Sequence, residues 1–409
     1  MAFFWPHDTR AQTLSPLGNE PVWSRLDAFQ STITEEEFRR LLDKVFAPGG
    51  AWHPYIHFED GFALIKKTLE PPTIYRLELA GEEPKPRPEQ YWRTPAELGY
   101  APSDRPLAGM RIALDPGHLG GAYARMEERW FHIGEDNPVT EGDMVLRVAN
   151  MLAPRLRALG AEVHFVRRSS APVTRQRTQH LMDAARDSLA LRGRTATRTS
   201  HDGPNDPLRG NSLQFEAERL FYRTSEIRAR ADLINQHFVP DLVICIHFNA
   251  ESWGEPEKPE LVDVHHLHLL INGCYDQREL SFDDIRFEML IKLLNGSHPE
   301  ELATSNAVAS SMARVSGLPP YVYLGSNAHR MSEYVWARNL LANRIFEAPT
   351  IYLEPYVMNS LQDYPRIQAG DYSGERMVGG KSQISIYQEY LQGVVEGLAQ
   401  HYREIRRAP

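Results

Sequence analysis

Cysteine is scarce in this chain of 409 residues, which contains only Cys245 and Cys274. Two cysteines provide neither a framework of disulfides nor a C-x-x-C metal knuckle. Any metal ion that the chain binds must therefore be held by nitrogen and oxygen atoms.

Long apolar runs and an excess of basic residues are also missing. No run approaches the roughly 18 apolar residues that a membrane-spanning helix needs, so we expect no transmembrane segment. The start, "MAFFWPHDTRAQTL", lacks the basic first residues and the apolar centre of a signal peptide. The formal net charge of −9 argues against a general affinity for nucleic acid, which requires a basic surface.

What the chain does contain is ordinary globular material, with 42% hydrophobic and 24% charged residues. Because its length exceeds that of a single hydrophobic core, we expect one large domain and a smaller one. Residues 1–105 predict a small α+β domain, of unknown role, that ends in a proline-rich connector. A helix with a capping box at Thr34 and Glu37 and a hairpin around residues 59–61 support this prediction.

Residues 106–409 alternate between strand and helix patterns from Met110 onward, which is typical of an α/β domain. We predict a mixed, mostly parallel sheet with helices on both faces, of the phosphorylase/hydrolase-like kind. Three irregular segments interrupt the alternation, at about 121–140, 171–220 and 274–300. The stretch 192–211 is polar, and we expect it to be mobile.

Four residues with acid or imidazole side chains lie close to predicted strand ends. His118 follows the strand in "IALDPGHLGG", His247 ends "DLVICIH", Glu354 ends "TIYLE", and Glu141 opens a helix after the first strand. Ligands of open α/β sheets bind at the carboxyl ends of the strands. We therefore expect these four side chains to converge at one edge of the sheet.

Two imidazoles and one carboxylate suit a zinc ion that keeps its fourth position for water. The remaining carboxylate, Glu354, would take a proton from that water and pass it to a leaving amine. Asp115 is the candidate to orient His118 from behind. Each residue also has an ordinary alternative: His247 as a hydrogen-bonded core histidine, Glu141 as a helix-dipole acid, and Glu354 as a surface acid.

The histidines of "VDVHHLHLLING" offer a second cluster that looks like a metal site. On a strand, His266 and His268 share one face while His265 points to the other. We therefore interpret these three residues as structural rather than as metal ligands.

Taken together, four segments resemble the zinc-dependent N-acetylmuramoyl-L-alanine amidases of the amidase-3 type. They are "IALDPGHLGG", "TEGDMVLRVANMLAPRLRALGAEVHFVRR", "RADLINQHFVPDLVICIHFNA" and "APTIYLEPYVMNS". In the third segment Cys245 replaces the family's usual serine and Asn249 is kept. In the fourth, Asn359 stands at the matching distance from the catalytic glutamate.

The resemblance implies that His118, Glu141 and His247 bind one Zn²⁺ per chain and that Glu354 is the general base. It implies hydrolysis of the amide between N-acetylmuramic acid and L-alanine in peptidoglycan, by a catalytic domain at residues 106–409. Peptidoglycan would be the partner, and a protein activator is possible. We expect a periplasmic or cell-envelope location, although this sequence shows no signal peptide. The alternatives are a zinc amidase or carboxypeptidase acting on another amide, and a catalytically silent wall-binding protein.

Three features depart from that family. The interval between His118 and Glu141 is long, so that the acids within it compete for the ligand role (Glu127, Glu128 and Glu135). The usual Gly-Phe after the catalytic glutamate is here Pro355-Tyr356. An additional amphipathic helix at 278–298, with Asp284 and Glu288, is expected to be a docked surface helix; the alternative is an inhibitory lid over the metal.

Overall fold

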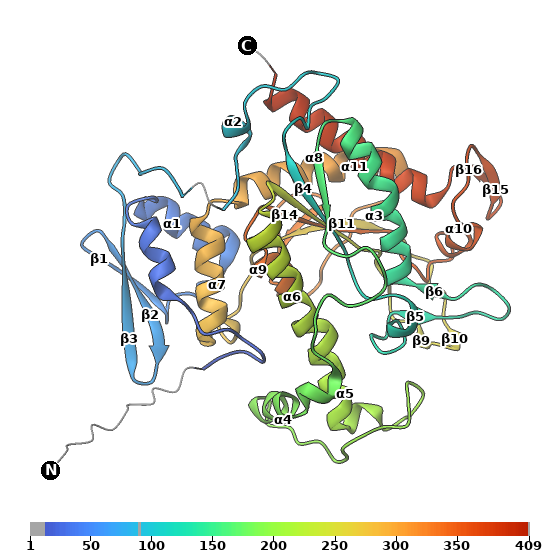
Figure 1. Cartoon of the computed structure of the whole chain (residues 1–409), viewed down its shortest axis with the longest axis horizontal. Coiled ribbons are helices and arrows are strands. Elements are labelled where there is room, and N and C mark those ends of the chain that lie inside the picture. Colours follow the sequence, from blue (N-terminus) through green and yellow to red (C-terminus); the bar gives the residue numbers. More distant parts are fainter. Residues whose placement is uncertain (1–12, 89–90, 408–409) are drawn as a thin grey trace. The chain divides into compact units, whose positions relative to one another are not determined.

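A computed structural model describes residues 13–88 and 91–407, which form two compact units (Figure 1). Unit 1 comprises the described residues up to Pro88 together with Gly273–Gly296, and unit 2 comprises the rest. The N-terminal segment that was assessed for a signal peptide, residues 1–14, consists largely of residues 1–12, which lie outside the described residues. No helix in the described part of the chain has the length and apolarity needed to cross a membrane.

The boundary between the units differs from the one expected at residue 105. Residues 91–105 belong to unit 2, because the amide of Ala101 donates to the carbonyl of Arg406 and Arg93 forms an ion pair of 2.6 Å with Asp241. These partners lie far along the chain, and composition alone gives no sign of them. The proline-rich connector is therefore shorter than the sequence suggests.

Unit 1 is an antiparallel sheet with helices, as the α+β prediction requires. The sheet has the order β1-β2-β3, and Thr34 caps α1 by accepting a hydrogen bond from the amide of Glu37 at 3.2 Å. The hairpin between β1 and β2 turns at Asp60 and Gly61, which both have positive φ. The elements are η1 (Trp23–Phe29), α1 (Glu35–Leu41), η2 (Leu42–Phe46), β1 (Ile56–Glu59), β2 (Phe62–Leu69), β3 (Pro72–Glu78) and α7 (Asp283–Leu294).

The α7 helix, expected as a docked surface helix or a lid, is instead a core helix of unit 1. Eleven of its 12 residues are buried. The guanidinium of Arg286 is fully buried and donates to the carbonyls of Lys66 and Lys67 at 2.7 and 3.0 Å. Asp284 accepts hydrogen bonds from the amide and hydroxyl of Ser15.

Unit 2 is built on a sheet whose seven described strands have the order β12-β13-β11-β14-β8-β4-β7. The strands β14, β8, β4 and β7 run parallel, β11 is antiparallel to β14 and parallel to β13, and β12 is antiparallel to β13. Their bounds are β4 (Arg111–Pro116), β7 (Glu162–Phe165), β8 (Leu242–Ile246), β11 (Leu267–Ile271), β12 (His329–Arg330), β13 (Val335–Ala337) and β14 (Thr350–Pro355).

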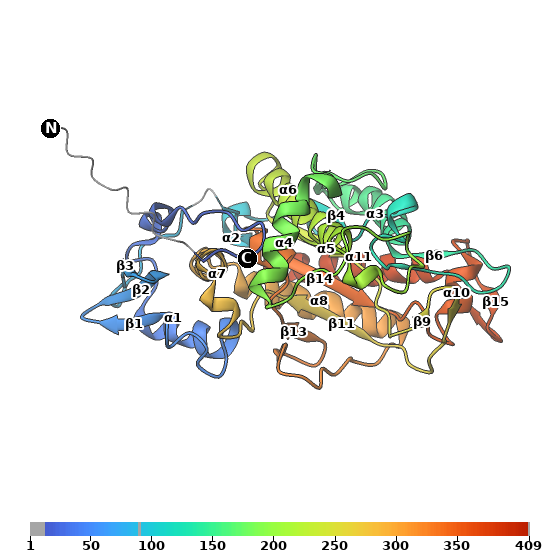
Figure 2. The ribbon, with the colours of Figure 1, turned by 90° about the horizontal axis from the view of Figure 1, so that it is seen from below.

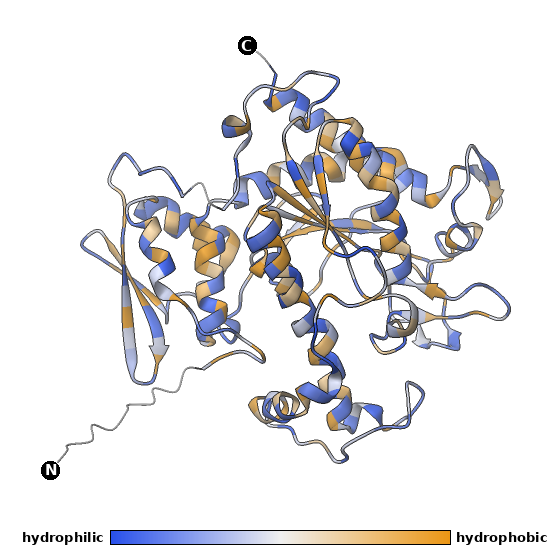
Figure 3. Cartoon of the chain, viewed as in Figure 1, coloured by the Kyte–Doolittle hydropathy of each residue, from blue (hydrophilic) through white to orange (hydrophobic). Residues whose placement is uncertain are grey.

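Helices cover both faces of this sheet (Figures 1 and 2). One layer contains α3 (Glu141–Ala158), α8 (His298–Ser316) and α11 (Ile386–Ile405), and the other contains α6 (Glu226–Asp232), η7 (Leu233–Phe238) and α9 (Leu341–Ile345). Every residue of β8 is buried, as expected for a parallel strand covered on both faces, and the central strands are largely apolar (Figure 3). The mixed, mostly parallel α/β fold is therefore confirmed.

Besides 274–300, which contains α7, a second segment predicted to be irregular contains helices. Within 171–220, α4 (Met182–Leu191) packs against α5 (Leu213–Leu220), and the Ser188 hydroxyl donates to Glu216 at 2.8 Å. The remaining short elements are α2 (Pro95–Leu98), α10 (Tyr364–Ala369), and the strand pairs β5 (Trp130–Phe131) with β6 (Val139–Thr140), β9 (Gly254–Glu255) with β10 (Lys258–Pro259), and β15 (Arg376–Val378) with β16 (Lys381–Gln383).

Candidate metal centre

Three neighbouring parallel strands bring the predicted site residues to one edge of the sheet. His118 lies just beyond β4, His247 follows β8, and Glu354 is the penultimate residue of β14. Because β8 pairs with both β4 and β14 in parallel register, the carboxyl ends of these strands lie side by side. Glu141 joins them from the first position of α3.

Three backbone features allow these groups to approach one another. Gly117 lies against the imidazole of His247, and a Cβ at this position would overlap the ring. The next residue, His118, has the left-handed φ of +49°, an uncommon conformation for a residue with a side chain. At the start of α3, a Cβ on Gly142 would overlap the backbone of Leu119, so the glycine lets the helix begin against the His118 loop.

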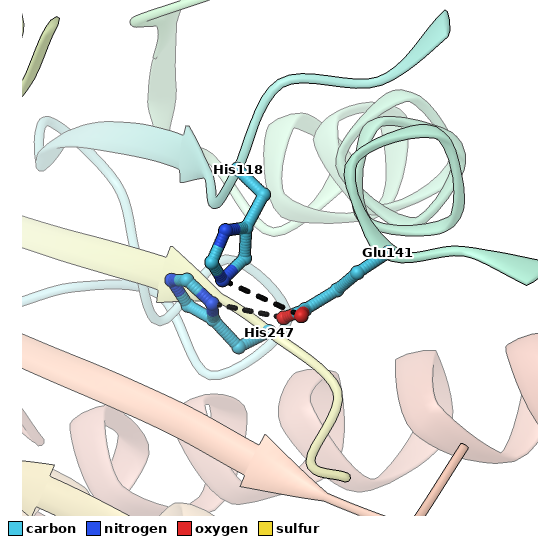
Figure 4. A group of neighbouring side chains, drawn as sticks. All are labelled: His118, Glu141 and His247. Carbon is cyan, nitrogen blue, oxygen red and sulfur yellow. Dashed lines mark hydrogen bonds and ion pairs between the residues drawn. The ribbon is translucent and has the colours of Figure 1, made fainter. Parts of the chain in front are cut away.

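Two imidazole rings and one carboxylate converge at this point (Figure 4). Nδ1 of His247 lies 3.1 Å from Oε1 of Glu141, and Nε2 of His118 lies 3.4 Å from its Oε2. One ligand atom from each of the three residues lies within 4.8 Å of the others. Among the described residues, this is the one such group of three or more histidine, cysteine or acidic side chains.

The donor set fits a divalent ion such as zinc. Ligand atoms bound tetrahedrally at about 2.0–2.2 Å lie roughly 3.3–3.6 Å from one another, and the two distances above are close to this range. Imidazole nitrogen and carboxylate oxygen are ordinary zinc ligands. The His118–Glu141–His247 cluster could therefore bind a metal ion.

The protonation states of the cluster also suit a metal ion. Burial lowers the pKa of His118 well below its usual value, against the opposing charge of Glu141, which favours the neutral ring. Burial alone would raise the pKa of Glu141, but His118, His247 and Arg129 together keep that pKa below its usual value. A neutral imidazole and an ionised carboxylate are the forms that bind metals.

Glu354 lies in the same cavity as the cluster without belonging to it. The cavity has a volume of about 360 Å³ and is lined by His118, Glu141 and Glu354, together with Asn249 and Trp253. Burial, supported by the negative charge of Glu141, raises the pKa of Glu354 well above its usual value. A raised pKa is typical of a carboxyl group that serves as general acid and base.

The residue that orients His118 is Glu127 and not Asp115. Oε2 of Glu127 lies 3.2 Å from Nδ1 of His118 and accepts a hydrogen bond from the amide of Leu119 at 2.9 Å. Asp115, two residues before Gly117 on β4, instead accepts from the guanidinium of Arg230 at 3.0 Å and from the thiol of Cys245 at 3.8 Å. The expectation for Asp115 is therefore corrected.

The other acids that competed with Glu141 lie outside the cluster. Glu128 lines the rim of the cavity with a half-exposed side chain, and Glu135 is exposed in the loop that follows β5. Glu127, the third competitor, supports a ligand residue as described above. Only Glu141 contacts both histidines.

The two candidate asparagines have different positions. Asn249 lines the cavity, whereas Asn359 is buried and ties two loops together. Its Oδ1 accepts from the amide of Glu251 at 3.0 Å and its Nδ2 donates to the carbonyl of Glu260 at 3.1 Å. Asn359 therefore stabilises the segment that forms the wall of the cavity but does not itself line the cavity.

The histidines of β11 lie outside the metal cluster, as interpreted from the sequence. His266 and His268 share one face with ring centroids 5.9 Å apart, and both pack against Tyr321. Nε2 of His268 lies 3.0 Å from the hydroxyl oxygen of Tyr323, within hydrogen-bond distance. Its neighbour in the sheet register is Glu354.

Sequence reasoning missed two residues of the site. The ring of Tyr352 stacks on His247 with centroids 4.1 Å apart, and strand alternation from Glu354 could have placed it on the same face. Nε of Arg129 lies 3.4 Å from both His118 Nε2 and Glu141 Oε2. No local pattern indicates Arg129, because it reaches the site from an irregular loop.

Comparison with known proteins finds similarity only among solved structures, since no protein-family description and no curated protein matches this chain. The N-acetylmuramyl-L-alanine amidase Ami1 from Mycobacterium smegmatis is 15% identical with a TM-score of 0.38, covering 72% of this chain and 98% of its own. The CwlD amidase from Clostridioides difficile, in complex with the GerS lipoprotein, is 12% identical with a TM-score of 0.38 and coverages of 72% and 98%. The amidase AmiC2 of Nostoc punctiforme is 14% identical with a TM-score of 0.34 and coverages of 73% and 97%.

Proposed function

We propose that this protein is a zinc-dependent amidase that hydrolyses the bond between N-acetylmuramic acid and L-alanine in peptidoglycan. The observation that carries the proposal is the convergence of His118, Glu141 and His247 beside a cavity that His118, Glu141 and the separate carboxyl group of Glu354 line. The choice of substrate rests on the four sequence segments that resemble the amidase-3 type. A wall substrate places the reaction in the periplasm or cell envelope.

In this proposal His118, Glu141 and His247 hold one zinc ion, and Glu354 moves the protons. When bound, zinc would supply a Lewis acid that polarises the scissile carbonyl and increases the acidity of water. Glu354 accepts the proton of the attacking water on a carboxylate oxygen as the new C–O bond forms. It returns that proton to the amide nitrogen as the C–N bond breaks, so that the peptide leaves as a neutral amine.

The protein around these groups holds them in position. Glu127 fixes the ring of His118 through Nδ1, and the stacked ring of Tyr352 fixes that of His247. A ligand held in this way loses little freedom when it binds the ion. Asn249 and Trp253, on the wall of the cavity, are placed to contact the substrate.

The test is mass spectrometry of the products from purified cell-wall sacculi, with and without a chelator. We expect free peptides that begin with L-alanine and glycan that keeps its lactyl groups. A chelator should abolish these products and added zinc should restore them. Cleavage at another bond would favour a different amidase or carboxypeptidase, and no cleavage would favour a silent wall-binding protein.

The role of Glu354 can be tested separately from metal binding. Glu354→Gln should lower turnover by about 10²–10⁴-fold, the usual contribution of a general acid–base group, while one zinc per chain remains in elemental analysis. The matched control is Glu135→Gln, an exposed acid of the β5–β6 loop, which should keep normal turnover. Normal turnover in Glu354→Gln would assign the proton transfer to another residue.

A further inference from the structure

A second cavity opens from the candidate metal centre on the face of the sheet covered by α6 and α9. It has a volume of about 390 Å³ and shares His118, Arg129 and Glu354 with the cavity described above. Its other walls include Arg223, from the turn before α6, and Arg338, which follows β13. We call it the arginine cavity. A substrate bound across His118 and Glu354 would extend into both cavities.

Of the three acids that line the arginine cavity, Glu354 belongs to the candidate site, and the other two, Asp115 and Glu127, have partners within the protein. Asp115 is paired with Arg230, and both side chains are only 4% exposed. Glu127 is held by His118 and the amide of Leu119. Asp115 and Glu127 are therefore engaged with these partners.

Arg223 and Arg338, in contrast, form no ion pair with any carboxylate of the described residues. Arg338 donates to the hydroxyl of Tyr323 at 3.3 Å and lies 5.4 Å from the centroid of its ring, and this contact holds the guanidinium in place. Arg223 is exposed beside the ring of Tyr222. Two guanidinium groups that form no ion pair among the described residues make this cavity suitable for an anionic group.

The first cavity has the opposite character. Its wall carries the acids Glu128 and Glu251, and Trp253 supplies an aromatic surface. Acidic acceptors beside an aromatic ring suit a neutral sugar, whose hydroxyls donate and whose ring face packs on the indole.

We propose that the arginine cavity binds carboxylate groups of the peptide that leaves as the amine, and that Arg338 and Arg223 determine specificity for acidic peptides. This proposal rests on the proposed function, because the two sides of the scissile amide differ in charge: the sugar side is mainly neutral and the wall peptide carries carboxylates. It fixes the direction of the substrate, with the sugar in the first cavity and the peptide over the arginines.

The test uses two probes that differ only in charge: N-acetylmuramyl-L-alanyl-D-glutamate, and the same compound with both glutamate carboxylates converted to carboxamides. Binding is measured by calorimetry on the zinc-loaded Glu354→Gln protein, so that no turnover occurs. We expect the acidic probe to bind at least about tenfold more tightly, the value of one charge-assisted hydrogen bond. High salt should reduce this preference because exposed charges are screened.

Arginine variants of the Glu354→Gln protein show which residues cause the preference for the acidic probe. Arg338→Gln and Arg223→Gln should each reduce it, and the double variant should remove it while leaving the affinity for the amidated probe unchanged. Arg376→Gln, an exposed arginine without an ion pair in the β15–β16 hairpin, is the matched control and should keep the full preference. Because Arg223 is exposed, its variant reports on recognition even if Arg338→Gln folds poorly.

Equal binding of the two probes, or a preference that survives in the double variant, would overturn this inference. Failure of the proposed function gives a different result: the native enzyme would release no peptides from sacculi, whereas the probe preference could still be measured. The two conclusions are therefore tested by separate observations.

Discussion

The carboxylate of Glu127 holds the imidazole of His118 from the side opposite the metal cluster. Its Oε2 lies 3.2 Å from Nδ1, while Nε2 of the same ring faces Glu141. The side chain of Glu127 is buried, and burial raises its pKa to about 7. A carboxylate behind a ligand histidine fixes the ring orientation and increases its basicity.

Replacing Glu127 should therefore weaken metal binding without removing a ligand. We expect Glu127→Gln to lower zinc affinity by about 10–100-fold, measured by competition with a chromogenic chelator. Glu128→Gln is the control, since that neighbouring side chain is half-exposed and does not contact His118. Unchanged affinity in Glu127→Gln would mean that the ring is fixed by its backbone alone.

The pair of Asp115 and Arg230 should contribute to stability rather than to catalysis. Arg230 is buried between Asp115 and Glu226, at 3.0 and 2.9 Å. Arg230→Met leaves two buried carboxylates without their cation and should lower the free energy of unfolding by about 3–5 kcal/mol. Chemical denaturation measures this loss, and a change below 1 kcal/mol would contradict it.

The control for this measurement is an exposed ion pair of the same type. Arg186 lies 2.7 Å from Asp183, with side chains 65% and 93% exposed. Arg186→Met should change the free energy of unfolding by no more than about 0.5 kcal/mol, because exposed pairs contribute little.

His268 should make the protein less stable in acid. Burial lowers its pKa from the usual 6.5 to about 3 in the folded state, so the unfolded chain binds this proton more readily between those two values. Stability contributed by the neutral ring is complete above pH 6.5 and decreases as the pH falls towards 3. One proton corresponds to a slope of about 1.4 kcal/mol per pH unit.

The test compares the pH dependence of unfolding with that of His268→Gln. Glutamine stays neutral at every pH and keeps an acceptor for the hydroxyl of Tyr323, so the slope between pH 3 and 6.5 should become smaller. Above pH 7.5 the plots of the free energy of unfolding against pH should run parallel for the two proteins. Identical slopes in acid would show that His268 does not titrate in this way.

The α7 helix should act as a structural element of unit 1. Leu290 is fully buried within this helix, so Leu290→Ala should lower the stability of unit 1 by about 2–5 kcal/mol. Deleting 278–298 should make residues 13–88 sensitive to limited proteolysis without raising hydrolytic activity. Increased turnover in the deletion variant would instead support an inhibitory lid.

Local sequence patterns were sufficient for the sheet and for the convergence of its site residues. The apolar run before His247 and the abrupt end of the strand before His118 predict buried parallel strands, and parallel strands place their carboxyl ends at one edge. The period of two along β14 would also have placed Tyr352 beside Glu354. These features depend on residues that are close together in the chain.

Only the tertiary structure decided which side chains support the site and where α7 belongs. Glu127 and Arg129 approach His118 through the path of an irregular loop, while Asp115 finds a partner 115 residues away in Arg230. Likewise, α7 packs on β2, more than 200 residues earlier in the chain. Burial and charge pairing select such partners only after the elements have packed. The periodicity of the sequence therefore does not indicate them.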